Sequence, residues 1–404
     1  MTFYPGLIES LATEHDSKIV FFIMDGLGGL SIPGRNQQTE LEAARTPSLD
    51  ALAKRSSCGL IVPITHGVTT GSGPGHLALF GYDPVEYNVG RGVLEAAGIG
   101  FELTDRDVAV RGNFATVDAD GNITDRRAGR LPTEENERVC QKMIEGIRIP
   151  GVELFIKPVK EHRVLVVFRG DGLAGDIEDT DPQETGVPPL APKATSPEAA
   201  KTASIVRDFI DQTARVLKGE DRANMVTLRG FAKHRPYPTM LERYKLRALC
   251  LANYPMYRGV SYLVNMDLHP VLPGVPEQID AMREAWDRYD FFFIHAKTTD
   301  KTGEDGDYEA KVAAIEALDD SVDRILAAKP DVLIVTGDHS TPAALGSHSW
   351  HPVPVLLHSQ YARLNPVDGF SEVECLKGAL GQFPAKDLMA LALAHAGRLK
   401  KFGA

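Results

Sequence analysis

One loop of this chain carries the residue types of a nucleophile. Ser72 lies among glycines in VTTGSGPGHLALFGYDP, residues 68–84, and the apolar pattern from His76 to Phe80 predicts a helix directly after it. A serine just before a helix N-terminus is close to free backbone N–H groups and to the positive end of the helix dipole, which favour an anion such as a phosphoryl group. An ordinary tight turn uses the same residues. The assignment therefore depends on partners elsewhere in the chain.

Acidic and imidazole side chains lie at the ends of several apolar runs that predict buried strands. In an open α/β sheet, the carboxyl ends of parallel strands form the edge where ligands bind. A mixture of carboxylates and imidazoles suits Mn²⁺, Zn²⁺ or Mg²⁺, and two such ions can activate a serine hydroxyl and hold phosphoryl oxygens. These side chains are Asp25 after the run 18–24, Asp300, Glu304, Asp305 and Asp307 after 291–295, Asp338 and His339 after 332–336, and His348 and His351 before an apolar strand.

The elements that must position these residues alternate between strand and helix near both ends of the chain. Residues 18–24, 58–64, 291–295 and 332–336 predict strands, and 44–53 and 199–217 predict helices. The middle has a different pattern, with short strands at 108–117, 122–125, 152–159 and 164–168 and a helix at 134–147. We therefore expect a core domain of residues 1–105 and 181–404 and an inserted α+β domain of residues 106–180, which would bind substrate or act as a lid.

Composition excludes several classes of function. The 404 residues are 43% hydrophobic and 25% charged with a net charge of -11, which argues against general binding to nucleic acid or a membrane surface. The apolar run 19–24 is too short to span a bilayer, and no signal peptide is evident. The four cysteines form no CxxC pair, so neither a disulfide framework nor a thiolate zinc site is indicated. We expect a cytoplasmic protein whose oligomeric state the sequence leaves open.

Longer motifs, collinear over nearly the whole chain, resemble one known family. They are MDGLGG from residue 24, ARTPSLDALA from 44, GSGPGHLALFGYDP from 71, GRGVLEAAGIG from 90, RGNFATVD from 111, DRRAGR from 125, TGDHSTP from 336 and HSWHPVP from 348. The chain resembles the archaeal-type cofactor-independent phosphoglycerate mutases of the alkaline phosphatase superfamily. The resemblance implies an α/β core with a doubly wound, mostly parallel sheet and a smaller inserted domain. It also implies interconversion of 3-phosphoglycerate and 2-phosphoglycerate through a phosphoserine, with two divalent metals and no 2,3-bisphosphoglycerate.

The resemblance also assigns metal ligands. It makes Ser72 the phosphoryl acceptor and, with Asp25, Asp338 and His339, a ligand of one metal. Asp300 and His348 belong to the second metal, where the family has a DxxGH pattern. This chain reads Asp300-Lys-Thr-Gly-Glu304 instead. A carboxylate in place of the imidazole adds negative charge and shifts the preference toward harder ions, so Mn²⁺ is our first choice, with Mg²⁺ or Zn²⁺ as alternatives. The opposing interpretation leaves Glu304 in solvent, with the second site either empty or completed by His351.

Basic residues of the insert are the expected substrate-binding groups. Fork-shaped guanidinium groups suit a ligand that carries both a phosphate and a carboxylate, although a run of charge is more often a solvated face. Lys297 lies near Asp300 and would neutralise the transferred phosphoryl group, and Arg258 falls where the family also has a basic residue. His66 and His76 flank the serine loop, and we expect structural roles for both. The substrate-binding set is Arg111, Asp125, Arg126, Arg127, Arg130, Lys297 and Arg258.

Three functions stay open at this point. The first is a metal-dependent phosphoglycerate mutase, an intramolecular phosphotransferase of the isomerase class that takes part in glycolysis and gluconeogenesis. The second uses the same phosphoserine chemistry on another small phosphate or phosphonate, as a phosphomutase or a phosphatase. The third is a catalytically weakened protein that binds a phosphorylated metabolite. All three share a small anionic substrate and exclude nucleic acid and membrane as partners.

Overall fold

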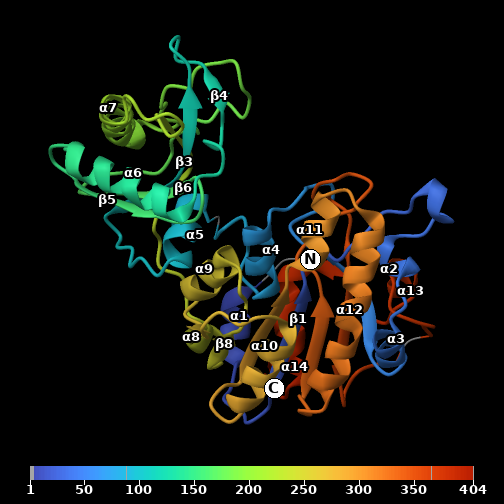
Figure 1. Cartoon of the computed structure of the whole chain (residues 1–404). Coiled ribbons are helices and arrows are strands. Elements are labelled where there is room, and N and C mark those ends of the chain that lie inside the picture. Colours follow the sequence, from blue (N-terminus) through green and yellow to red (C-terminus); the bar gives the residue numbers. More distant parts are fainter. Residues whose placement is uncertain (1–3, 88, 365, 404) are drawn as a thin grey trace. The chain divides into compact units, whose positions relative to one another are not determined.

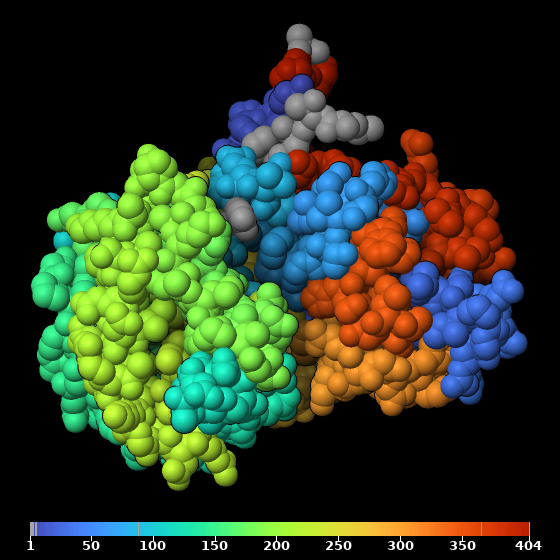
Figure 2. Space-filling view, turned by 90° about the horizontal axis from the view of Figure 1, so that it is seen from above, coloured from blue at the N-terminus to red at the C-terminus, as the bar shows by residue number. Residues whose placement is uncertain are grey.

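The computed structural model describes residues 4–87, 89–364 and 366–403. The chain divides into two compact units, which we call unit 1, residues 1–88 and 237–404, and unit 2, residues 89–236. Figure 1 colours the chain by residue number, and unit 1 contains both blue and red segments. In the space-filling view, early blue and late orange-to-red segments lie side by side on one surface (Figure 2). The expected insert, residues 106–180, falls within unit 2.

An eight-stranded, mostly parallel sheet forms the centre of unit 1, in the order β13-β2-β12-β11-β1-β10-β8-β9. Strand β12 is antiparallel to both of its neighbours, and the other pairs are parallel. The expected α/β class with a mostly parallel sheet is confirmed. The strands are β1 (Ile19–Met24), β2 (Ser57–Val62), β8 (Ala248–Cys250), β9 (Asp267–Leu268), β10 (Phe291–Ala296), β11 (Val332–Thr336), β12 (Val353–Ser359) and β13 (Gly381–Pro384).

The central strands form because their side chains are apolar on both faces. Every residue of β1 is buried, and the same holds for β10 and β11 on either side of it. A strand that is buried on both faces needs such a continuous apolar run. Strand β1 follows its predicted range 18–24 within one residue, and β11 matches its predicted range. The three strands therefore fix the positions of the residues that follow them.

Helices cover this sheet. The helices of unit 1 are α1 (Pro5–Leu11), α2 (Glu40–Ala43), α3 (Pro47–Ala53), α4 (Ser72–Leu79), α8 (Met240–Tyr244), α9 (Pro255–Leu263), α10 (Val275–Glu284), α11 (Thr298–Glu304), α12 (Tyr308–Leu326), α13 (Glu372–Leu376) and α14 (Leu388–His395). Helices α10 and α12 lie in front of the sheet in Figure 1. Among the described residues, no helix combines the length and the apolar character that a membrane span needs.

Unit 2 is an α+β unit with its own core. Its strands are β3 (Asp107–Val117), β4 (Ile123–Asp125), β5 (Glu153–Pro158), β6 (Arg163–Arg169) and β7 (Met225–Lys233), and its helices are α5 (Arg91–Gly98), α6 (Thr133–Gly146) and α7 (Ala200–Val216). Alternate residues of β3, such as Val108 and Val110, face an apolar core shared with Phe168 and Phe209. The predicted strands and helices of this region lie within one or two residues of the observed ones.

Candidate metal centre and nucleophile

One edge of the unit 1 sheet collects the predicted metal ligands. Strands β11, β1 and β10 are neighbours and run parallel, so their carboxyl ends meet at this edge. Asp25 follows β1, Asp300 lies in α11 just after β10, and Asp338 and His339 follow β11. Because β12 runs antiparallel, the residues before it, including His348, reach the same edge. Four strands and their connections therefore bring together side chains that are distant in sequence.

The first group of possible ligands is Asp25, Asp338 and His339, all buried. Nε2 of His339 lies 3.5 Å from Oδ1 of Asp25 and 3.2 Å from Oδ2 of Asp338. Oγ of Ser72 lies 3.0 Å from the same Nε2. Ser72 is thus in the same cluster as the three side chains that the family resemblance places with it.

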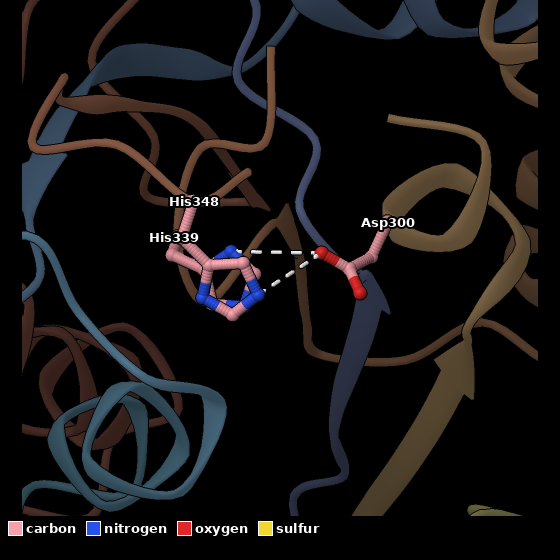
Figure 3. A group of neighbouring side chains, drawn as sticks. All are labelled: Asp300, His339 and His348. Carbon is pink, nitrogen blue, oxygen red and sulfur yellow. Dashed lines mark ion pairs between the residues drawn. The ribbon is translucent and has the colours of Figure 1, made fainter. Parts of the chain in front are cut away.

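The second group is Asp300, His339 and His348. The two imidazole rings stack with centroids 3.7 Å apart, and Asp300 faces both of them (Figure 3). Nε2 of His348 lies 3.5 Å from Oδ1 of Asp300 and also 3.5 Å from Oε1 of Glu304. The Glu304 side chain is 52% exposed, yet this oxygen points at the imidazole. His351 instead contacts Ser349 and stacks on Trp350.

The electrostatics of this cluster favour a bound cation. Asp25, Asp300 and Asp338 are fully buried, and Lys297 is the ammonium group that pairs with two of them. Burial and the neighbouring Asp338 carboxylate raise the pKa of Asp25 well above its usual value. Oδ1 of Asp25 and Oδ2 of Asp338 are buried and have no hydrogen-bond partner among the described residues. Buried carboxylates without partners are costly, and divalent ions would remove this cost.

The two imidazoles of the second group differ in their pKa values, because the carboxylates of Glu304 and Asp300 raise the pKa of His348 despite its burial. Burial lowers the pKa of His339 to about 4, so the ring is neutral at physiological pH. Burial also opposes protonation of Lys297, but Asp25 and Asp300 outweigh this effect and raise the pKa of its ammonium group. The cluster thus holds one neutral imidazole at His339, carboxylates and the fixed positive charge of Lys297.

Helix α4 begins at Ser72 itself, earlier than the predicted start at His76. The residue three positions into the helix is Pro74, which is tolerated there because first-turn N–H groups have no partner inside the helix. Gly75 explains how closely the helix approaches the ligands, since a Cβ at this position would lie 2.6 Å from the backbone oxygen of Asp338. The glycine therefore lets the Ser72 hydroxyl reach the carboxylate cluster.

Sequence reasoning missed two aromatic groups at the cluster. The hydroxyl of Tyr257, on α9, donates to Oδ2 of Asp25 and accepts from Nζ of Lys297 at 2.8 Å. Nε2 of His295, in β10, lies 3.5 Å from the same carboxylate oxygen. The position of His295 at the end of an apolar strand could have indicated it, whereas nothing in the sequence marks Tyr257. His76, expected to be structural, is buried with Nδ1 3.2 Å from Oδ2 of Asp338.

Sequence reasoning also missed Lys311, a fully buried lysine close to the cluster. Its Nζ donates to the backbone oxygens of Gly26 at 3.0 Å, Gly28 at 3.1 Å and Thr341 at 2.8 Å. The first two lie in the loop after β1 and the third in the loop after β11. Lys311 thus ties together the two loops that carry Asp25 and His339. Lys311 lies on the apolar stripe of α12, and a lysine at such a position could have indicated a buried ammonium group.

The expected substrate-binding arginines lie in unit 2. Arg126 pairs with Asp181 through two hydrogen bonds of 3.1 and 2.9 Å, and Asp181 is buried. The Asp125 carboxylate accepts from the backbone N–H groups of Arg127 and Gly129, so it shapes the loop. Arg127 and Arg130 are exposed.

A denser group of arginines surrounds Arg111. Its Nε is buried and has no hydrogen-bond partner among the described residues, and burial, together with neighbouring arginines, lowers its pKa to about 10. The neighbouring arginines are Arg91, Arg163 and Arg229, which sequence reasoning did not single out. Such crowding of positive charge favours an anionic ligand. In unit 1, Arg258 instead donates to the backbone oxygens of Ala252 and His269.

Comparisons with known proteins point to one family. Residues 53–222 match a family model described as 2,3-bisphosphoglycerate-independent phosphoglycerate mutase. A relative from Aquifex aeolicus is 49% identical over 407 residues, which are 98% of this chain and 100% of the relative. A relative from Thermus thermophilus is 50% identical over 409 residues, covering both chains completely. Both carry the name probable 2,3-bisphosphoglycerate-independent phosphoglycerate mutase.

Two solved structures share the fold. A protein from Pyrococcus horikoshii is 29% identical with a TM-score of 0.82, and the match covers 96% of this chain and 99% of that one. A cofactor-independent phosphoglycerate mutase from Thermoplasma acidophilum is 27% identical with a TM-score of 0.70, covering 94% of this chain and 100% of that one. The similarity extends over both units.

Proposed function

This chain belongs to the family of 2,3-bisphosphoglycerate-independent phosphoglycerate mutases, and we propose that it interconverts 3-phosphoglycerate and 2-phosphoglycerate through a phosphoserine at Ser72. The observation that carries the proposal is the position of the Ser72 hydroxyl, at the first residue of α4 and 3.0 Å from Nε2 of His339. A hydroxyl beside buried carboxylates and the neutral imidazole of His339 supports a role in phosphoryl transfer.

We assign two divalent ions to the cluster. The donor set fits them, because Oδ1 of Asp25 and Oδ2 of Asp338 are buried without partners and the imidazole of His339 is neutral. The ions would supply Lewis-acid stabilisation of phosphoryl oxygens and would lower the pKa of the serine hydroxyl. Asp25, Ser72, Asp338 and His339 would hold one ion, and Asp300, Glu304 and His348 the other. Mn²⁺ is our first choice, and 2,3-bisphosphoglycerate is not required.

The chain's own groups perform the transfer in two steps. Oγ of Ser72 forms a bond to phosphorus while the bond from phosphorus to the 3-oxygen of the glycerate breaks, and the proton lost by Ser72 is balanced by the one gained at that oxygen. The glycerate then turns so that its 2-hydroxyl attacks the phosphoserine, which restores Ser72. Lys297, paired with Asp25 and Asp300, would neutralise negative charge on the phosphoryl group in both steps.

Unit 2 is proposed to hold the substrate anion. The guanidinium groups of Arg111, Arg126, Arg127 and Arg130, with the loop shaped by Asp125, provide bidentate donors for a phosphate and a carboxylate. The unpartnered Nε of Arg111 supports this role. Arg258 already donates to two backbone oxygens, so its assignment as a substrate-binding residue has the least support in the set.

A single incubation tests the function. The Mn²⁺-loaded protein is mixed with 3-phosphoglycerate, without 2,3-bisphosphoglycerate, and phosphorus NMR follows 2-phosphoglycerate and free phosphate together. We expect 2-phosphoglycerate to form up to its equilibrium ratio with little free phosphate. Free phosphate alone would assign the chain to a phosphatase on the same site. Neither product would overturn the proposed reaction and favour a binding protein.

A further inference from the structure

Strand β5 forms a free edge of the unit 2 sheet. It pairs with β6 on one side, and the described residues place no strand on the other. Beside this edge lies an apolar groove of about 390 Å³ between β5 and the end of α6, lined by Ile144, Ile147, Ile149, Val152, Leu154 and Ile156. Ile144 is 42% exposed. A free edge next to an apolar groove is a surface on which another strand can add.

The backbone of β5 determines which residues an added strand would meet. The N–H of Val159 donates to the oxygen of Arg163, which makes this the first hydrogen-bonded pair of the β5–β6 ladder. Hydrogen-bonded pairs alternate along an antiparallel ladder, so Phe155 and Lys157 bond to β6. Leu154 and Ile156 therefore direct their N–H and C=O groups outward. Pro158 has no N–H to donate and ends the available edge.

The side chains of β5 are complementary to a second copy of the same strand. In an antiparallel pair centred on Phe155, Leu154 of each copy bonds to Ile156 of the other, so the outward backbone groups match. The same register places exposed Glu153 of each copy opposite exposed Lys157 of the other. If the strand pair were centred on residue 154 or 156 instead, Glu153 of one copy would no longer lie opposite Lys157 of the other. One register therefore satisfies both the backbone and the charges.

We propose that two copies of this chain form a symmetric dimer by antiparallel pairing of their β5 strands, with Leu154 and Ile156 of each copy extending the apolar groove of the other. The pairing uses each edge once, so it closes as a dimer and does not continue into a fibre. It lies outside the metal cluster and does not depend on the proposed function.

Charge reversal tests this register. We expect the wild-type protein to sediment at twice the chain mass in the micromolar range. Glu153→Lys and Lys157→Glu each place like charges opposite one another at two symmetry-related positions, and each should weaken dimerisation by about 10-fold or more. The double variant Glu153→Lys/Lys157→Glu restores opposite charges and should return the dimer to within about 3-fold of wild type. Circular dichroism checks that each variant is folded.

Cross-linking provides a second, independent readout. Phe155 lies on the symmetry axis in a non-hydrogen-bonded pair, where Cα atoms are about 4.5 Å apart, so Phe155→Cys should form an intermolecular disulfide when oxidised with copper phenanthroline. Glu153→Cys is the matched control, because its two copies would be roughly 13 Å apart. A wild type that stays monomeric up to about 0.1 mM overturns the proposal. The proposal is also overturned if the charge variants dimerise as tightly as wild type and Phe155→Cys gives no intermolecular cross-link.

Discussion

The backbone oxygen of Thr70 lies 2.8 Å from Nδ1 of His348. A carbonyl accepts only a proton donor, so Nδ1 carries a hydrogen and Nε2 is the nitrogen available to a metal ion. Nε2 faces Oδ1 of Asp300 and Oε1 of Glu304, each 3.5 Å away. The two carboxylates raise the pKa of His348, and a divalent cation between the three groups would take the place of the proton on Nε2. The loop that carries the nucleophile thus also orients a ligand of the second proposed ion.

The first prediction concerns Glu304. We expect two metal ions per chain by elemental analysis in the wild type and one in Glu304→Ala, with kcat reduced by about 100-fold. Glu304→His should keep two ions and shift the preference from Mn²⁺ toward Zn²⁺. Asp305→Ala is the control, because it removes an exposed neighbouring acid without touching His348. Two ions and normal kinetics in Glu304→Ala would contradict the assignment.

Ser72→Ala should abolish mutase activity and leave the fold intact. The substitution removes the proposed phosphoryl acceptor, whereas the loss of one hydroxyl from the first residue of α4 has little effect on the core. Activity assays and thermal melts measure the two effects separately. Ser347→Ala is the control, because this exposed serine bonds only to the nearby backbone oxygen of Leu345. Appreciable turnover in Ser72→Ala would disprove a phosphoserine at this position.

Removal of divalent ions should stop the reaction and lower the thermal midpoint. Lys297 pairs with only two of the three buried carboxylates, so chelation leaves part of their negative charge without compensation. Calorimetry after exhaustive chelation, followed by titration with Mn²⁺, checks both effects. We expect activity and the melting temperature to recover together over the same range of metal concentration. Full activity in a metal-free sample would contradict the two-metal proposal.

The arginines of unit 2 should divide into two kinds. Arg130→Ala removes an exposed guanidinium, so KM should rise and kcat/KM should fall about 10-fold, with an unchanged thermal midpoint. Arg126→Ala should lower kcat/KM similarly but also destabilise unit 2, because it removes the two hydrogen bonds to the buried Asp181. If neither variant changes the kinetics, both arginines belong to a solvated surface.

Lys311→Met should lower metal affinity although Lys311 contacts none of the proposed ligand atoms. The variant removes the ammonium donor from three buried carbonyl groups, of which Gly26 and Gly28 keep only the shared N–H of Thr341, and we expect the free energy of unfolding to fall by about 3 kcal/mol. Because the loops that carry Asp25 and His339 lose their common anchor, metal affinity and kcat should fall while KM changes little. Lys301→Met, at an exposed position of α11, is the control. Unchanged metal affinity in Lys311→Met would limit the lysine to a role in stability.

The regular elements were predictable because their side-chain periodicity is strong. The apolar run of β1 and the alternation in β3 gave ranges within one residue of the structure. The antiparallel direction of β12 could not be predicted, because its residues are apolar whichever way they run. The contact of Tyr257 with Asp25 depends on how α9 packs, and helix periodicity alone does not identify the partner of one buried tyrosine. The sequence motifs indicated which residues to expect as metal ligands, and the tertiary structure gave the distances between them.

The order of the central sheet has a consequence for the growing chain. Strand β1 is completed at Met24, but its neighbours β10 and β11 begin only at Phe291 and Val332. During synthesis from the N-terminus, IVFFIM therefore leaves the ribosome well before either partner strand exists. Unit 2 is complete in sequence before then and has its own core, so it can fold first. Until β10 emerges, the unpaired β1 segment is a target for chaperones and for aggregation, and the metal ligands cannot assemble.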